Sequence, residues 1–449
     1  MASIPQLLLA YYGDDFTGST DALEFLTRAG LRTALFMAPP TAAQLARFPD
    51  LQAVGVAGLT RSLAPADMEA ELRPAFSALR ALGPRHVHYK VCSTFDSSPT
   101  VGSIGRATEI GADIFGGRYV PLLVGAPALG RYCVFGNLFA RMGIGSTGAI
   151  HRLDRHPSMS RHPVTPADES DLRLHLAKQT KKRSGLFDIL KTPLSEATAR
   201  VALDQIVADG AEIVLFDVLQ PDQLARIGAL IDGEAGQGKP VFSVGSSGIE
   251  MALGAFWSGR ANPPDEPSSE AAQRGRFALP AFSDPGPAAP LLVVSGSCSP
   301  VTAGQIAWAE AHAFAMIALD PGAPDVTAAS AAAIKALKAG SHTLVYTSRG
   351  EAAASVSAEI LGTALGKIAR TALQQAGLRR LLVAGGDTSG YAGRALGIEA
   401  VEMIAPLAPG APLCRAFAPG SPADGLELNF KGGQVGAPDY FGAVARGII

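Results

Sequence analysis

The stretch "LLLAYYGDDFTGSTDALEFL", residues 7–26, determines how the rest of the chain is interpreted. An apolar run ends at Gly13, two adjacent carboxylates follow as Asp14 and Asp15, and a helical pattern begins directly after them. A strand that leads into a helix through a short polar turn is typical of a β-α-β unit. In open sheets of this kind, ligands bind beyond the carboxyl ends of the strands, where this acidic pair would lie.

Size and composition limit the classes of protein that fit. The chain has 449 residues, a formal net charge of -2 and 47% hydrophobic residues. This length suggests two or three domains of roughly 100–200 residues each. The near-neutral charge excludes a basic nucleic-acid surface, and no apolar run approaches the roughly 20 residues of a membrane span. No secretory signal is visible, and the four widely spaced cysteines favour a reducing compartment. We therefore expect a cytoplasmic protein without nucleic acid or membrane partners.

Short apolar runs alternate with helical patterns along most of the chain. Residues 19–30 and 65–83 are predicted helices, and the alternation indicates parallel sheets that are covered on both faces. From residue 261 to 290, Pro, Ser and charged residues replace the periodic pattern, which indicates a linker. We predict an α/β fold with two α/β domains, at residues 1–260 and 291–449, with an active-site cleft between them. The predicted strands lie within residues 4–13, 32–37, 51–59, 86–93, 120–127, 211–218, 239–248, 290–300, 342–348 and 379–390.

Two glycine motifs resemble nucleotide fingerprints but lack their context. The segment "GIGSTG", residues 143–148, matches G-x-G-x-x-G, yet the preceding residues 136–142 look helical where a strand is needed. The segment "GEAGQGKP", residues 233–240, nearly completes a P-loop, but Pro240 replaces the Ser or Thr that would hold magnesium. The motif also precedes its strand, so we reject it.

Three other small-residue turns have the strand-loop-helix context of an anion site. They lie within residues 240–257, 291–309 and 379–397, and the glycine loop at 429–441 is a fourth candidate wall. Small residues let a ligand approach the backbone, and the N–H groups of a helix start favour an anion. One such turn is ordinary in any α/β fold, but two in the second domain favour a nucleotide phosphate. The predicted nucleotide-side residues are Ser295, Ser297, Ser299, Gly385, Gly386, Asp387, Thr388 and Gly433.

The acidic pair itself has a plain interpretation and a catalytic one. One carboxylate could cap the following helix. Two adjacent carboxylates repel each other unless a cation lies near them or one accepts a proton. A phosphotransferase uses such a group to accept the proton of the attacking hydroxyl while metal and donors hold the phosphates. We therefore assign Asp15 as the candidate base and Asp14 as a second catalytic group that places substrate or magnesium.

Polar residues also follow two further predicted strands. Arg61 in "GLTRSL" could clamp a carboxylate with two hydrogen bonds, and Lys90 could pair with the same group. Ser93 and Asp96 follow Lys90, and Asp96 could bind sugar hydroxyls. The plain alternatives are a structural ion pair for Lys90 and a turn or cap for Asp96.

The segment "HRLDRHPSMSRHPVTP", residues 151–166, is dense in His and Arg. Its histidines lack the helical spacing of a zinc pair, and no cysteine ligand lies nearby. An anion-binding loop and a solvated loop without a role both remain open. We predict no resident metal cluster.

Taken together, the motifs place the chain beside a known family. "GDDFTGSTDALEFL", "YKVCSTFDSSP", "HPSMSRHPVTP", "VVSGSCSPVTAGQI" and "AGGDTSG" occur in this order, and the chain resembles the four-carbon acid sugar kinase family over nearly its whole length. The resemblance implies phosphorylation of threonate, erythronate or 3-oxo-tetronates with ATP and Mg²⁺. It also implies that the acid sugar binds in the N-terminal domain, at Asp14, Asp15, Arg61, Lys90 and Asp96, and the nucleotide in the C-terminal one.

Some residues depart from the family pattern. Gly13 stands where Ala is common, and Val101 and Gly102 precede "SIG" where a "GNIG" motif is common. The second departure borders the expected sugar-acid site, which leaves a branched or longer oxo acid open as the substrate. Two other functions are also open: a dinucleotide-dependent hydroxy-acid dehydrogenase and a non-catalytic sugar-acid binding protein. The oligomeric state is unassigned, with a homodimer as one option.

Overall fold

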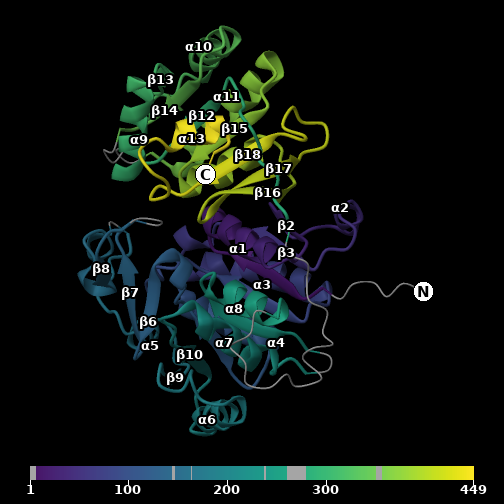
Figure 1. Cartoon of the computed structure of the whole chain (residues 1–449), viewed down its shortest axis with the longest axis vertical. Coiled ribbons are helices and arrows are strands. Elements are labelled where there is room, and N and C mark those ends of the chain that lie inside the picture. Colours follow the sequence, from purple (N-terminus) through teal and green to yellow (C-terminus); the bar gives the residue numbers. More distant parts are fainter. Residues whose placement is uncertain are drawn as a thin grey trace. The chain divides into compact units, whose positions relative to one another are not determined.

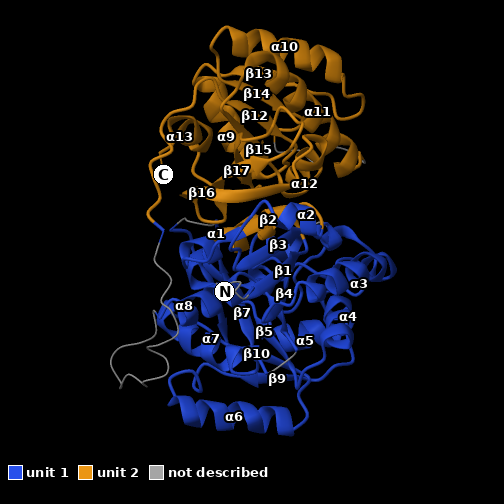
Figure 2. Ribbon diagram, turned by 90° about the vertical axis from the view of Figure 1, so that its right-hand side faces the viewer, with its two compact units in different colours: residues 1–14, 25–33, 39–280 blue, residues 15–24, 34–38, 281–449 orange. Residues whose placement is uncertain are grey.

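The computed structural model describes residues 7–143, 147–162, 164–236, 239–259, 280–349 and 356–448. They form two compact units, coloured separately in Figure 2. Unit 1 consists of residues 1–14, 25–33 and 39–280, and unit 2 of residues 15–24, 34–38 and 281–449. The predicted first domain includes residues 15–24 and 34–38, whereas in the structure they belong to unit 2. The predicted domain boundaries at residues 260 and 291 stay a prediction. Most of the predicted linker, residues 261–279, lies outside the described residues.

Unit 1 is built on a parallel sheet with the strand order β3-β1-β4-β11-β5-β10-β9. Figure 1 labels β3, β10 and β9 of this sheet. Helices α3 and α4 cover one face, and α7 and α8 cover the other (Figure 2). The strands are β1 (Leu9–Gly13), β3 (Ala53–Ala57), β4 (His86–Lys90), β5 (Val120–Leu123), β9 (Ser184–Phe187), β10 (Ile213–Phe216) and β11 (Val241–Gly245). The helices are α2 (Ala42–Leu45), α3 (Pro65–Ala81), α4 (Ile104–Phe115), α5 (Leu172–Ala177), α6 (Glu196–Ala208), α7 (Leu224–Asp232) and α8 (Gly248–Trp257).

The burial of these strands explains why the sheet is parallel. Every residue of β1, β3 and β4 is buried, as expected for strands that are covered on both faces. The helix predicted at 65–83 is α3, which continues through Pro74. The helix predicted at 19–30 is α1 (Phe16–Arg28), and its apolar positions Ala22, Leu23 and Leu26 are fully buried. The α/β prediction is therefore confirmed for this part of the chain.

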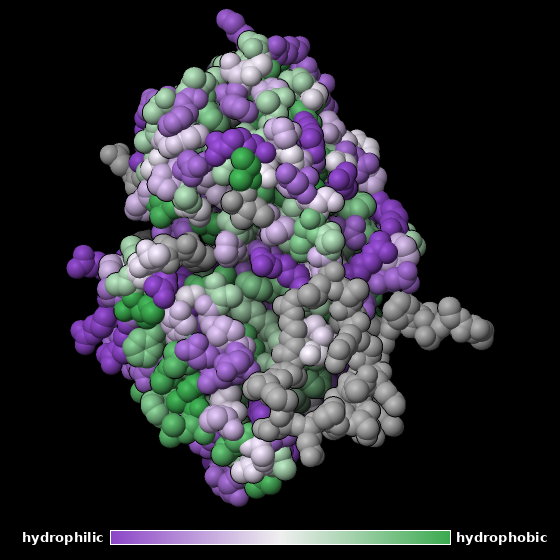
Figure 3. Space-filling view, viewed as in Figure 1, coloured by the Kyte–Doolittle hydropathy of each residue, from purple (hydrophilic) through white to green (hydrophobic). Residues whose placement is uncertain are grey.

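A second, antiparallel sheet in unit 1 corrects the helix predicted at 136–142. It consists of β6 (Arg131–Val134), β7 (Asn137–Arg141) and β8 (Ile150–Arg152) in that order. Burial alternates along β7, with Leu138 and Ala140 inward, which is the two-residue period of a strand. Apolar side chains lie on the surface around β7 and β8 (Figure 3). Residues 144–146 of the "GIGSTG" segment lie outside the described residues, and β7 and β8 on either side do not form the strand-to-helix turn of a dinucleotide site.

Unit 2 has five parallel strands in the order β13-β14-β12-β15-β18, followed by antiparallel β17, β16 and the end of β2 (Thr33–Phe36). Helices α9 and α13 lie on one face, and α11 and α12 on the other (Figure 2). The remaining strands are β12 (Leu292–Ser295), β13 (Ala315–Ala318), β14 (Thr343–Tyr346), β15 (Arg380–Ala384), β16 (Ala400–Ala408), β17 (Ala411–Phe417) and β18 (Glu427–Lys431). The helices are α9 (Pro300–Ala311), α10 (Val326–Lys338), α11 (Ala358–Ala376), α12 (Gly386–Ala395) and α13 (Tyr440–Arg446).

A buried ion pair joins the starts of β15 and β18. Arg380 and Glu427 are register partners, and the Arg380 side chain is fully buried. Its Nε and Nη2 donate to Glu427 Oε2 at 2.9 and 2.6 Å, and its Nη1 donates to the Val444 carbonyl at 2.6 Å. Because a buried guanidinium without its carboxylate is strongly unfavourable, this pair should limit the stability of unit 2.

We expect Glu427→Gln to lower the free energy of unfolding of unit 2 by about 3 kcal/mol, because it leaves the Arg380 charge uncompensated. The chain has two tryptophans, Trp257 in unit 1 and Trp308 in unit 2, so urea unfolding followed by fluorescence in a Trp257→Phe background reports unit 2. The matched control is Glu310→Gln, which removes an exposed partner of Arg349 and should cost less than about 1 kcal/mol. Equal effects of the two substitutions would contradict the prediction.

Candidate functional site

The end of β1 is held by hydrogen bonds to both neighbouring strands. In unit 1 the Asp14 N–H donates to the Lys90 carbonyl at 2.8 Å, and the Gly58 N–H donates to the Gly13 carbonyl at 3.0 Å. The Arg61 N–H donates to the Asp14 carbonyl at 3.0 Å. The turns after β1, β3 and β4 are therefore joined at the carboxyl edge of the sheet, where parallel α/β proteins bind ligands.

The first carboxylate of the acidic pair faces a cation. Arg61 Nε donates to Asp14 Oδ2 at 3.1 Å, and Nη2 donates to Asp14 Oδ1 at 2.8 Å. Asp14 is buried, whereas the Arg61 side chain is 26% exposed. This two-pronged pair holds the guanidinium in the orientation that a second carboxylate could also bind.

The second carboxylate belongs to unit 2 and caps a helix. Asp15 Oδ1 accepts from the Gly18 N–H at 2.8 Å, and its Oδ2 accepts from the Thr17 hydroxyl at 2.8 Å. A methyl group placed on Gly386 would lie 3.4 Å from Asp15 Oδ2 and 3.5 Å from Thr17 Oγ1. Asp15 therefore lies beside the start of α12, which carries part of the predicted nucleotide site.

The turn after β4 contains the predicted substrate residues Lys90, Ser93 and Asp96. Lys90 is buried and its Nζ donates to the Val91 carbonyl at 2.9 Å, and Ser93 is also buried. Phe95, which lies between Ser93 and Asp96, has φ 58°, a backbone conformation that is unfavourable for a residue with a bulky side chain. Such strain is found at functional turns more often than elsewhere, because the surrounding structure must hold it.

Asp96 lines a small cavity together with residues from distant parts of unit 1. Its Oδ1 atom is buried and has no hydrogen-bond partner within the described residues. The neighbouring Ser97 hydroxyl lies 2.9 Å from His175 Nε2 on α5 and accepts from Gln179 Nε2 at 2.9 Å. A buried carboxylate oxygen without a donor is suited to a ligand that brings a hydroxyl group. The cavity is lined by Thr94, Phe95, Asp96, Ser97, Leu153, Thr165, Ala167, Leu172 and His175.

The His-rich segment mainly stabilises its own turns. His156 Nδ1 accepts from the N–H groups of Ser158 and Met159 at 3.2 and 3.3 Å, and His162 Nδ1 accepts from the Thr165 N–H at 3.1 Å. Since Thr165 lines the Asp96 cavity, the segment contributes a wall to it. Pro163 lies outside the described residues.

In unit 2 the predicted small-residue turns lie together. A methyl group on Gly385 would lie 2.7 Å from Thr388 Oγ1 and 3.4 Å from the Ser297 nitrogen. One on Gly433 would lie 2.9 Å from Ser299 Cβ and 3.0 Å from Ser297 Oγ. Ser299 caps α9, whereas α12 begins at Gly385 without a side-chain cap. The N–H groups at the start of α12 therefore suit an anion.

Two predicted residues differ in exposure from the others. Ser295 is fully buried as the last residue of β12, and its hydroxyl has no partner within the described residues. Asp387 lies in the first turn of α12 and is exposed. Asp387 is therefore exposed to a ligand in this structure, whereas Ser295 is not.

The loop after β18 is held against α9 by residues that the sequence analysis did not select. Gln305 Nε2 donates to the carbonyls of Val435, Gly436 and Ala437 at 3.0–3.1 Å. Lys431, at the end of β18, donates to the Thr302 hydroxyl at 2.9 Å. The segment "NFKGG" provided a signal, since a lysine at a strand end directly before two glycines has the same form as the other turns.

Within the described residues, no group of three or more His, Cys, Asp or Glu side chains could hold a metal ion. Magnesium in nucleotide enzymes is often bound by one or two carboxylates together with the phosphates, so this finding leaves room for Mg²⁺ that arrives with ATP. The Asp387 carboxylate, which is exposed in the first turn of α12, fits that mode of binding. No helix in the described part of the chain is long and apolar enough to cross a membrane.

Comparisons with known proteins match two domains within the chain. Residues 9–253 match a sugar-binding N-terminal domain, and residues 292–441 match a nucleotide-binding C-terminal domain. A 3-oxo-isoapionate kinase of Paraburkholderia graminis is 44% identical, over 98% of this chain and 94% of its own. A 3-oxo-tetronate kinase of Methylobacterium radiotolerans is 33% identical, over 97% of this chain and 98% of its own. A solved structure from Salmonella typhimurium LT2, described as a putative tRNA synthase, has a TM-score of 0.76 at 25% identity and covers 99% of this chain and 100% of its own.

These matches show the class of enzyme and the family to which the chain belongs. The protein is a phosphotransferase with a sugar-binding and a nucleotide-binding domain. The chain belongs to the four-carbon acid sugar kinase family, whose members phosphorylate small sugar acids. The resemblance noted in the sequence is thereby confirmed, and the roles of individual residues stay predictions.

The two adjacent glycines of α12 differ in what they tolerate. Gly385 has φ 121° and ψ 135°, and a methyl group there would lie too close to Thr388, whereas at Gly386 the nearest atoms are at ordinary contact distance. We expect Gly385→Ala to lower the free energy of unfolding of unit 2 by about 1–3 kcal/mol. Gly386→Ala is the control and should keep the urea midpoint of the parent, measured through Trp308. A Gly385→Ala chain as stable as its control would show that the turn relaxes freely.

Proposed function

We propose that this kinase transfers the γ-phosphoryl group of ATP to a hydroxyl of a 3-oxo sugar acid, with 3-oxo-isoapionate as the first candidate. The relative with that name is 44% identical over 98% of the chain. The departures from the family pattern at Val101 and Gly102 fall on the turn that follows Asp96. A methyl group on Gly102 would lie too close to the Arg61 carbonyl oxygen, so this turn packs directly against the backbone of the proposed carboxylate-binding residue.

One observation carries the proposal: consecutive residues serve two different sites. Asp14 pairs with Arg61 in unit 1, and Asp15 lies beside Gly386 in unit 2. A kinase must bring an acceptor hydroxyl and a phosphoryl group together and must remove the proton of the hydroxyl. A dipeptide that contributes one carboxylate to the acid-binding residues and the next one to the phosphate turns fits that requirement.

The residues then have the following roles. Arg61 binds the carboxylate of the sugar acid, since it is more exposed than the buried Lys90, which positions the turn. Asp96 accepts a hydrogen bond from a sugar hydroxyl. Asp15 accepts the proton of the attacking sugar hydroxyl while the oxygen of that hydroxyl bonds to the γ-phosphorus, and the bond from the γ-phosphorus to the β-phosphate oxygen breaks to release ADP.

The nucleotide is held by the turns of unit 2. The N–H groups at the start of α12 and the hydroxyls of Ser297 and Ser299 donate to the phosphates. Mg²⁺ would supply charge neutralisation when it is bound to these phosphates, and Asp387, which is exposed at the start of α12, is the carboxylate that would hold it.

Location and assembly are part of the same proposal. The four cysteines Cys92, Cys133, Cys298 and Cys414 are all free thiols, which fits a reducing cytoplasm. A homodimer stays a prediction.

The proposed activity is tested by measuring ADP release from ATP with 3-oxo-isoapionate, with 3-oxo-tetronates and with a panel of four- and five-carbon sugar acids. Absence of turnover with every 3-oxo acid would overturn the proposed substrate class.

We expect Asp15→Asn to reduce kcat by about 10²–10⁴-fold, because asparagine cannot accept the hydroxyl proton at this position. The fold should persist, since an asparagine oxygen can still accept from the Gly18 N–H and cap α1. ADP binding, measured by calorimetry, should remain within about threefold of the parent, which separates chemistry from nucleotide affinity. Full turnover in Asp15→Asn would remove Asp15 from the role of base.

Arg61→Lys should raise KM for the sugar acid by about 10-fold or more, because lysine keeps the charge but loses the two-pronged geometry. KM for ATP should change little. Arg118→Lys, at a half-exposed arginine of unit 1, is the matched control and should leave both constants unchanged. Equal KM values for the sugar acid in the two variants would show that Arg61 does not bind the carboxylate.

A further inference from the structure

Lys431 is a buried cation at the end of β18 in unit 2. The residue is 0% exposed, and its Nζ donates to Thr302 Oγ1 at 2.9 Å. No other partner of this ammonium is recorded among the described residues, and no carboxylate there forms an ion pair with it. An ammonium buried without a counterion is unfavourable, so a lysine in this position needs a reason other than stability.

The surroundings of Lys431 are polar but provide no negative charge. Burial lowers the pKa of the Lys431 ammonium to about 7. No neighbouring charge among the described residues raises or lowers this pKa further. Thr302 and Gln305, on the helix α9 that packs over this strand end, are uncharged. Tyr440 of α13 donates to Asn429, and burial raises the pKa of its hydroxyl, so it stays neutral. The acidic groups of the neighbouring turns, at positions 15 and 387, do not contribute to the Lys431 shift.

The hydroxyl that Lys431 contacts connects it to the phosphate turns. Thr302 Oγ1 accepts from Lys431 and from the Ser297 hydroxyl, the latter at 3.1 Å, and it donates to the Gly433 carbonyl at 3.0 Å. The Lys431 carbonyl also accepts from the Gly385 N–H at 2.9 Å. Lys431 is therefore bonded directly to Thr302 and Gly385, and Thr302 connects it to the turns of Ser297 and Gly433.

We propose that Lys431 is a phosphate-binding residue of this kinase, whose ammonium becomes the counterion of the terminal phosphates of the bound nucleotide. The proposal rests on the nucleotide site of the proposed function and adds a residue that was not assigned to it. A phosphate that binds among Ser297, Gly385 and Gly433 supplies the negative charge that Lys431 does not receive from a carboxylate of the described residues. The two N–H groups of the ammonium that do not bond to Thr302 are then available to it.

The pH dependence follows from the sign of the shift. Below pH 7 Lys431 is already charged in the free protein, so it binds phosphate without taking up a proton. Above pH 7 it is mostly neutral, and a bound phosphate moves its pKa back toward the ordinary lysine value of about 10.4. Nucleotide binding at pH 8 should therefore take up close to one proton at Lys431, and this contribution to affinity should decline as the pH rises above 7.

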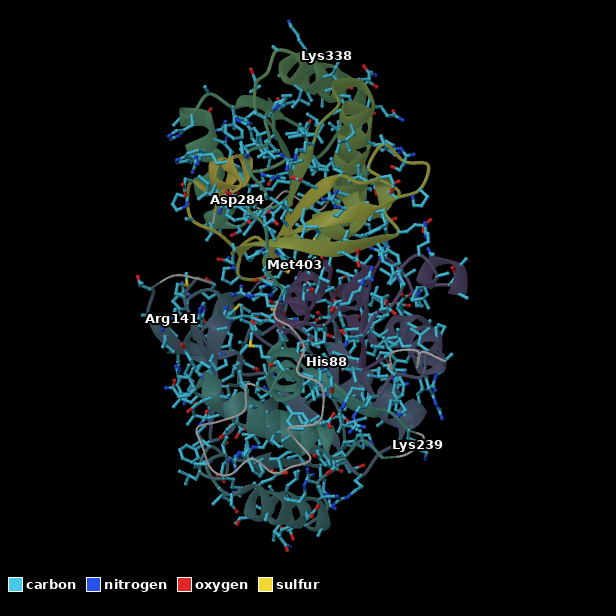
Figure 4. All side chains as sticks on the ribbon, turned by 45° about the vertical axis from the view of Figure 1, so that its right-hand side comes forward. His88, Arg141, Lys239, Asp284, Lys338 and Met403 are labelled. Atoms are coloured by element: carbon cyan, nitrogen blue, oxygen red, sulfur yellow. The ribbon has the colours of Figure 1, made fainter. Side chains whose placement is uncertain are left out.

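The experiment uses ADP as the probe and isothermal titration calorimetry at pH 8 in two buffers of different ionisation enthalpy. We expect the parent to take up about one proton more than Lys431→Met, with Kd at least about tenfold lower. Lys431→Arg should keep part of the affinity but lose the proton uptake, because arginine stays charged throughout. The matched control is Lys338→Met, at an exposed lysine at the end of α10 in the same unit (Figure 4), which should behave as the parent. Protons that ADP itself takes up or releases on binding contribute equally to the measured uptake of every variant.

Thermal unfolding separates a binding role from a structural one. Lys431→Met removes an uncompensated buried charge, so Tm should be equal to or higher than that of the parent. A lower Tm together with unchanged ADP affinity would make Lys431 a structural residue and overturn the proposal. Equal affinity and equal proton uptake in the parent and Lys431→Met would also overturn it. If the parent itself binds no ADP, the proposed nucleotide site fails, and that result is distinguishable from failure of the Lys431 assignment alone.

Discussion

Three backbone hydrogen bonds at the end of β1 constrain the turns of unit 1 that carry the proposed acid-binding residues. They join Gly13 to Gly58, and Asp14 to Lys90 and Arg61, so that the turns after β1, β3 and β4 meet at one edge of the sheet. Backbone bonds of this kind do not depend on side-chain rotamers, and they fix where each side chain begins. The ion pair of Asp14 with Arg61 can then form with two good hydrogen bonds, because both residues start from positions that the sheet sets.

The same end of β1 explains how two adjacent carboxylates coexist. Asp14 is compensated by a guanidinium in unit 1, and Asp15 by the N–H and hydroxyl donors of a helix start in unit 2. The plain interpretation of a helix cap therefore describes Asp15 in the folded chain, and Arg61 is the nearby cation that allows Asp14 to lie next to it. Neither interaction excludes catalysis, since a capping carboxylate whose oxygen lies beside Gly386 is held in place for a ligand of the neighbouring turn.

Most of the parallel core was predictable because each strand is short, apolar and followed by a turn of small residues. The antiparallel strand β7 was predicted as a helix, because Leu, Ala, Arg and Met in residues 138–142 all favour helices and the run is too short for its two-residue period to stand out. Its strand state comes from pairing with β6 and β8, which a local pattern does not contain. The placement of residues 15–24 in unit 2 likewise depends on contacts with residues hundreds of positions later.

Side-chain burial was harder to predict than secondary structure, and Lys431 shows why. A lysine before two glycines at a strand end is an ordinary surface pattern, and its burial results from Thr302 and Gln305, which hold the following loop against α9 from about 130 residues away in the sequence. Three unfavourable features lie at such turns: the strained Phe95, the unpartnered Asp96 oxygen and the buried Lys431. At each of these positions, a residue without backbone strain or an uncompensated polar group would make the folded chain more stable. Because all three lie where the sheets end and a ligand is expected, their cost in stability is best explained by the partner that a ligand provides.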